Sequence, residues 1–99
     1  MDILLIDDEP AVRKSLSLFL TELGHTVTTA SDGREGIEAY DSRPFPLVLT
    51  DITMPRMDGF ELLRQIRKRR SGMTDVVIIT GRGDVQSAVT ALREGAYDY

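Results

Sequence analysis

Three short apolar runs without polar alternation constrain the fold of this chain most strongly. They lie at residues 3–6, 47–50 and 76–79 and read ILLI, LVLT and VVII. A strand with one solvated face alternates apolar and polar residues, whereas a strand covered on both faces stays apolar throughout, as in parallel sheets. We therefore expect three neighbouring buried strands in a parallel sheet that has helices on both faces.

Helical patterns separate these runs, so strands and helices alternate along the whole chain. Residues 25–30 are β-prone but half polar, which suits an edge strand; residues 84–95 form a fourth helical pattern, and residues 96–99 resemble the start of a fifth strand. Right-handed crossovers leave few topologies for this pattern. We predict an α/β fold, a flavodoxin-like doubly wound parallel sheet of order 2-1-3-4-(5), ending after about four strand–helix units.

Capping residues mark the helix boundaries. Asp8 is a candidate cap for the first helix, with Pro10 in its first turn, and Gly24 supplies the stop. Asp32 and Asp58 each stand three residues before a glutamate, the spacing of a capping box, and open the second and third helices. The apolar residues of the first helix fall on one face at helical spacing: Val12, Leu16, Phe19, Leu20 and Leu23.

Acidic residues follow two of the buried runs. Asp7 and Asp8 end the first, Asp51 ends the second, and Thr80 ends the third. Ligand sites of open α/β sheets lie beyond the carboxyl ends of the strands, so the three carboxylates should share one small volume. Like charges so close resist ionising together, and hard oxygen ligands suit Mg²⁺. A carboxylate there can act as a nucleophile toward phosphorus, with the Thr80 hydroxyl donating to a phosphoryl oxygen. The alternative is that these acids only cap helices.

Composition narrows the class of protein. The 99 residues predict a single domain over residues 1–99. No cysteine is present, which is compatible with a reducing cytoplasm, and neither a signal peptide nor a membrane-spanning stretch is apparent. The net charge of −4 argues against direct nucleic-acid binding. A basic run at 64–70 is interpreted as a solvated helix face near a helix C-terminus rather than as a nucleic-acid patch.

The chain resembles, over its whole length, the receiver domain of two-component response regulators. The matching motifs are LIDDEP at 5–10, LTDITMPRMDG at 49–59, IITG at 78–81 and EGAYDY at 94–99. The resemblance implies that Asp51 is the phosphoacceptor and that Asp7 and Asp8 hold Mg²⁺ together with Asp51. It also implies that Thr53 lends its backbone carbonyl to the metal.

The same resemblance implies a switch. Thr80 is similar to the hydroxyl that turns toward the phosphoryl group, and Tyr99 is similar to the rotating aromatic of the fifth strand. The family carries a lysine, a proline and a fifth helix after that aromatic, and this chain stops before them. We therefore expect an incomplete receiver domain, less stable than its parent, whose exposed edge favours a homodimer or a strand-exchanged oligomer.

These observations lead to a functional hypothesis. The chain is expected to be a signalling domain, not an enzyme, that takes a phosphoryl group from a histidine kinase or phosphotransfer protein and relays it to an output domain or target protein. One alternative is a degenerate interaction module with a silent site. Another is a phosphohydrolase with an aspartate nucleophile, although Thr53 stands where the haloacid-dehalogenase-like phosphatases carry their second aspartate.

Overall fold

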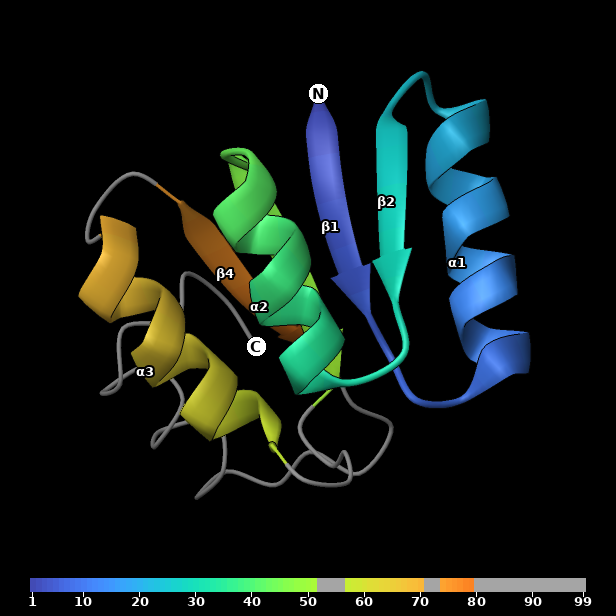
Figure 1. The fold of residues 1–99 in the computed structure, drawn as a ribbon. Coiled ribbons are helices and arrows are strands. Elements are labelled where there is room, and N and C mark those ends of the chain that lie inside the picture. The colour runs from blue at the N-terminus through green and yellow to red at the C-terminus, as the bar shows by residue number, and fades with distance from the viewer. Residues whose placement is uncertain (52–56, 71–73, 80–99) are drawn as a thin grey trace.

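The computed structural model describes residues 1–51, 57–70 and 74–79 of the chain, and within them strands and helices alternate without exception (Figure 1). The fourth helix and the fifth strand expected from the sequence lie outside these residues. The elements are β1 (Asp2–Ile6), α1 (Pro10–Glu22), β2 (Thr26–Ala30), α2 (Gly33–Ser42), β3 (Leu47–Asp51), α3 (Gly59–Arg70) and β4 (Asp75–Ile79).

The strands form one parallel sheet of order β2-β1-β3-β4. The polar β2 lies at one edge and the three apolar strands lie side by side, which confirms the predicted flavodoxin-like α/β topology for the first four strands. The register pairs Ile6 of β1 with Thr50 of β3. The residues that follow these two positions, Asp7 and Asp51, therefore lie at the same edge of the sheet.

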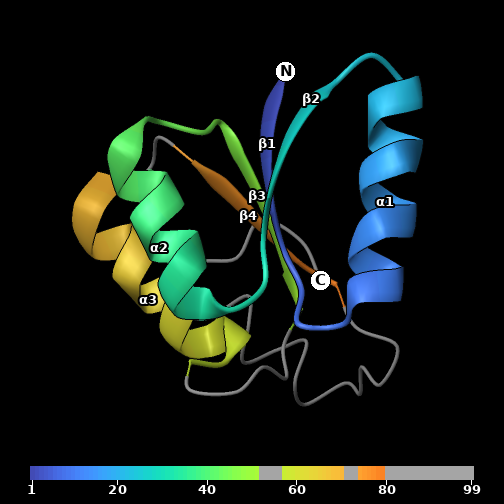
Figure 2. The ribbon, with the colours of Figure 1, turned by 45° about the vertical axis from the view of Figure 1, so that its right-hand side comes forward.

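The two faces of the sheet are covered unequally. Helices α2 and α3 lie together on one face and α1 lies on the other, as the view along the sheet shows (Figure 2). The main core forms between the sheet and the pair α2 and α3. Its members are fully or nearly fully buried, and at about 25 cal/mol per Å² their burial is the main source of stability: Leu4, Ile6, Ala30, Ile37, Tyr40, Phe45, Val48, Leu62, Leu63, Ile66, Val76 and Ile78.

On the opposite face, α1 packs more loosely than its sequence predicts. No residue of α1, all of which is described, is buried, and Phe19 and Leu23 of the predicted apolar face are 58% and 59% exposed. Strand β3 reflects the same difference, because Val48 and Thr50 are buried toward α2 and α3 whereas Leu47 and Leu49 are only half-buried. The expectation that β3 is fully covered on both faces was therefore wrong.

The caps of α2 and α3 are those that the sequence predicts. The Asp32 carboxylate accepts a hydrogen bond from the Glu35 backbone N–H at 2.8 Å. Asp58 does the same for Glu61 at 2.9 Å. Gly24, with φ of +97°, follows the end of α1 in a conformation that favours glycine.

The prediction that Asp8 caps α1 was wrong. The N-cap residue is Glu9, in an extended conformation and without a side-chain cap bond. The physical reason is Pro10, whose fixed φ suits the first helical position and thereby makes the residue just before it the cap. Asp8 is one residue too early for that role.

Two glycines let α2 approach its neighbours closely, Gly36 at the sheet and Gly33 at the segment before α3 (Gly59–Arg70). A Cβ atom added at Gly36 would lie 2.5 Å from Cδ1 and 2.9 Å from Cγ1 of Ile6, the last residue of β1. A Cβ atom at Gly33 would lie 2.8 Å from Cβ of Met57. Because real Cβ atoms do not come so near to other atoms, a larger residue at either position would require Ile6 or Met57 to move away from α2.

A buried hydroxyl pair joins three segments at the opposite edge of the sheet, where the strands begin. The Tyr40 hydroxyl on α2 and the Thr74 hydroxyl before β4 lie 2.6 Å apart. Thr74 also donates to the Phe45 carbonyl at 2.8 Å, and Arg67 of α3 donates to the Thr74 carbonyl at 3.0 Å. These bonds tie α2, α3 and the segment before β3 to the start of β4.

Candidate functional site

Three carboxylates converge at the carboxyl end of β1 and β3. Asp7, Asp8 and Asp51 each offer an oxygen atom, and these atoms all lie within 4.8 Å of one another. Asp7 is buried, Asp51 is half-buried and Asp8 is exposed. The expectation that neighbouring strands bring the three acids together is confirmed.

Asp7 is fixed at three of its polar groups. Its backbone N–H donates to the Ala30 carbonyl at the end of β2, at 3.1 Å. One carboxylate oxygen, Oδ1, accepts a hydrogen bond from the Glu9 backbone N–H at 2.9 Å, an Asx-type turn that shapes the β1–α1 connection. Its carbonyl accepts a hydrogen bond from Arg13 at 2.7 Å. The most buried acid of the cluster is thus anchored through both its backbone and its side chain.

The donor set fits a hard divalent cation. Three carboxylates place a formal charge of about −3 in a small volume, and a bound cation would offset their mutual repulsion. Mg²⁺ takes oxygen ligands and keeps several waters, so a few carboxylates with an exposed side suffice. Buried Asp7 supplies the anchored side of such a site, and exposed Asp8 leaves the other side open to water and to a partner.

The remaining predicted site residues stay predictions. Thr53, Thr80 and Tyr99 lie outside the described residues. The structure describes the chain again from Met57, whose Cβ and backbone oxygen lie close to Gly33 at the start of α2. The end of the β3–α3 connection is therefore packed against α2.

Sequence reasoning missed the contact between Arg13 and Asp7. A helical side chain leans toward the N-terminus of its own helix, so an arginine one turn into α1 can reach back to the end of β1. The spacing of Arg13 from the acidic pair was the available signal. Long side chains have many accessible directions, and spacing alone did not single out this one.

The basic run on α3 makes structural contacts. Arg64 pairs with Glu61 at 3.0 Å, Arg69 pairs with Asp41 of α2 at 2.7 Å, and Arg67 donates to Thr74. The pKa of Glu61 lies below its usual range because the Gln65 side chain, and next Arg64, donate hydrogen bonds to its carboxylate. The sequence interpreted this run as a solvated helix face rather than a nucleic-acid patch, and in the structure three of its arginines make contacts within the chain.

None of the helices that the structure describes is both long enough and apolar enough to span a bilayer.

Comparison with known proteins gives one consistent result. The model of the response regulator receiver domain matches residues 3–99. Transcriptional regulatory protein TcrA of Mycobacterium tuberculosis (strain H37Rv) is 40% identical over 97 residues, which cover 98% of this chain and 38% of TcrA. DNA-binding transcriptional regulator NtrC of Escherichia coli (strain K12) is 43% identical over 94 residues, which cover 95% of this chain and 20% of NtrC.

A solved structure agrees with the fold. The crystal structure of a response regulator receiver domain protein from Clostridium thermocellum superposes with a TM-score of 0.92 at 36% identity, over 99% of this chain and 79% of that one. The curated relatives are much longer: this chain spans about two-fifths of TcrA and one-fifth of NtrC.

Proposed function

The chain belongs to the response regulator receiver domain family, and on that premise we propose that it is a phosphoacceptor signalling domain. It takes a phosphoryl group onto Asp51 from the phosphohistidine of a histidine kinase or of a phosphotransfer protein. The observation that carries this proposal is the convergence of Asp7, Asp8 and Asp51 within 4.8 Å at the carboxyl end of two neighbouring strands. Thr53, Thr80 and Tyr99 are assigned to metal binding and switching by family resemblance alone.

The chemistry follows from the charges of the site. A carboxylate oxygen of Asp51 forms a bond to phosphorus while the phosphorus–nitrogen bond of the donor breaks, and its electron pair returns to the imidazole. Asp7 and Asp8, together with Asp51, are the residues that would hold the cation. When bound, Mg²⁺ offsets the negative charge of the carboxylates and of the transferred phosphoryl oxygens. Half-buried Asp51 beside exposed Asp8 leaves room for the donor to approach.

The wider role rests on the relatives. TcrA and NtrC are named as transcriptional regulators, and both extend well beyond the matched region. We infer that residues 1–99 form one receiver domain in the cytoplasm, which controls an output domain or target protein rather than binding DNA itself. The domain accepts one phosphoryl group and turns over no separate substrate, so it is not an enzyme in the ordinary sense.

Incubation of the chain with acetyl phosphate and Mg²⁺ tests this proposal. Intact-mass measurement should show a stable gain of one phosphoryl group. Asp51→Asn should abolish the gain, because the amide oxygen is a far weaker nucleophile than the carboxylate. Asp75→Asn is the matched control, since it makes the same change at the opposite edge of the sheet, where β4 begins, and should leave the gain intact.

Three other outcomes of the acetyl phosphate experiment would contradict the proposed function. Steady release of phosphate without a lasting mass gain would indicate a phosphohydrolase. No change in mass would indicate a silent interaction module. A gain that persists in Asp51→Asn would show that another residue accepts the phosphoryl group.

A further inference from the structure

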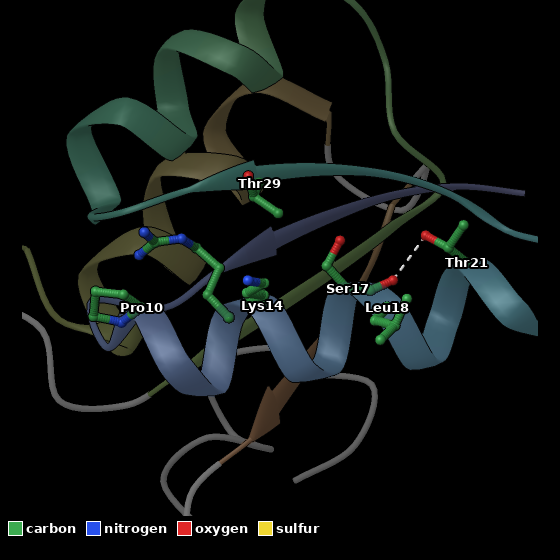
Figure 3. A pocket seen from close by; sticks show the side chains of 7 residues that line it. Pro10, Lys14, Ser17, Leu18, Thr21 and Thr29 are labelled. Carbon is green, nitrogen blue, oxygen red and sulfur yellow. Dashed lines mark hydrogen bonds between the residues drawn. The ribbon is translucent and has the colours of Figure 1, made fainter.

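Arg13 connects helix α1 to the acid cluster. It lies one turn into the helix, and its guanidinium donates a hydrogen bond of 2.7 Å to the backbone carbonyl of Asp7. Arg13 also lines a hollow of about 560 Å³ along α1. Figure 3 shows Pro10, Lys14 and Leu18 along this side of α1 and Thr29 of β2 facing it. Among the hydrogen bonds of residues 1–51, 57–70 and 74–79, the bond to Asp7 is the one that links Arg13 to the acid cluster.

The bond lies where the backbone of β1 leaves the sheet. The register of β1 with β3 ends at Ile6, so the Asp7 carbonyl lies beyond the last residue that this ladder pairs. A charged donor satisfies that carbonyl and holds the peptide between Asp7 and Asp8 in one orientation. The direction of the Asp8 side chain depends on this peptide, because it leaves the chain at the very next residue.

We infer that Arg13 is a positioning residue of the cation site: it holds the turn from which Asp7 and Asp8 project and so fixes the distance between their carboxylates. The inference rests on the proposed function in that the acids serve to bind a cation. Within the described residues, Arg13 donates its hydrogen bond to a backbone carbonyl and not to a carboxylate of the cluster. Its contribution acts through the geometry of the two acids.

Because Arg13 is positively charged, the direction in which Mg²⁺ affinity changes when this charge is removed tests the inference. A cation near a metal site repels the metal, so removing the charge would by itself strengthen Mg²⁺ binding. Loss of positioning has the opposite effect, because groups that orient metal ligands contribute about tenfold to a hundredfold to metal affinity. A positioning role therefore predicts weaker binding when the charge is removed.

The experiment is a Mg²⁺ titration of the unphosphorylated chain, followed by the amide resonances of Asp7, Asp8 and Glu9. Arg13→Met keeps an unbranched, flexible side chain but removes the charge and the donors, and should weaken Mg²⁺ binding by about tenfold. Arg13→Lys keeps one charged donor and should restore part of that loss. Lys14→Met removes a neighbouring charge that lines the same hollow and should bind Mg²⁺ as tightly as the native chain, or slightly more tightly.

Binding by Arg13→Met that equals or exceeds that of the native chain overturns the inference. If Arg13→Met does not fold, Arg13→Gln is measured instead and must also bind more weakly than the native chain. Failure of the proposed function has a different signature, in which the native chain binds Mg²⁺ with these resonances but gains no phosphoryl group from acetyl phosphate. A native chain that does not bind Mg²⁺ overturns both.

Discussion

Replacing Thr74 with valine should destabilise the fold more than its single hydroxyl suggests. Thr74 is 3% exposed and Tyr40 is fully buried, so water does not compensate for lost bonds at this position. The Thr74 hydroxyl donates its only hydrogen to the Phe45 carbonyl. In the bond between the two hydroxyls, Tyr40 is therefore the donor and Thr74 the acceptor. Thr74→Val removes both bonds and keeps the shape of the side chain.

The size of the effect follows from this order of donors. In Thr74→Val the loss of the bond to Tyr40 costs about 1 kcal/mol, and the Phe45 carbonyl, which loses its bond from Thr74, costs about 1–3 kcal/mol, so the free energy of unfolding should fall by about 2–4 kcal/mol. Tyr40→Phe removes one donor and leaves the bond to Phe45 in place, so it should cost about 1 kcal/mol. Both single changes remove the same bond, and the double variant should cost less than their sum by about 1 kcal/mol.

Urea denaturation followed by circular dichroism measures all three variants, with the slope m checked for constancy. Pure additivity of the two changes would show that the hydroxyls do not interact. A Tyr40→Phe variant less stable than Thr74→Val would reverse the assignment of donors. Either result refutes the reasoning, because it depends on Thr74 serving two partners.

Three further predictions concern the contacts around the sheet. Gly36→Ala should destabilise the fold by about 1–2 kcal/mol, since overpacking against Ile6 exceeds the gain in helix propensity, and combining it with Ile6→Val should cost less than the sum in urea denaturation. Carbon NMR should give Glu61 a pKa below its usual range, and this pKa should rise in Gln65→Ala. Because the pKa of Glu61 is lower in the folded state than in the unfolded state, the contact stabilises the fold above the unfolded-state pKa. This stabilisation is lost as the pH falls through the folded-state pKa. Saturating Mg²⁺ should raise the unfolding temperature. At a Mg²⁺ concentration a hundredfold above the dissociation constant, the free energy of unfolding should rise by about 2.7 kcal/mol, and either a chelator or Asp7→Asn should remove this gain. An unfolding temperature that does not respond to Mg²⁺ would contradict the assignment of a cation site.

The strand order and the convergence of the acids were predictable because their signals are local. An apolar run marks an inner strand of a parallel sheet, and the position of a carboxylate at its end follows from the direction of the strands. Strand β2 was placed at the edge by its threonines alone. The caps Asp32 and Asp58 were predictable for the same reason, since a cap and its partner are three residues apart.

Features that depend on tertiary packing were not predictable in this way. The apolar face of α1 predicts burial, but how much of Phe19 is covered depends on which elements share that side of the sheet. The bond between Tyr40 and Thr74 joins residues 34 apart, and no periodicity reports it. The need for Gly36 follows from the depth of α2 over Ile6, which exists only once the sheet has formed.

The uneven covering of the sheet has a consequence for how the site keeps its order. Proteins open locally, and a helix that buries little apolar surface detaches at a lower free energy than the core. Because no residue of helix α1 is itself buried, we expect α1 to open before the core beneath α2 and α3, so that amide hydrogen exchange in α1 runs ahead of global unfolding. Each such opening breaks the bond from Arg13 to Asp7. The geometry of the acid cluster is thus coupled to a local unfolding equilibrium, and any partner that holds α1 down also orders the cation site.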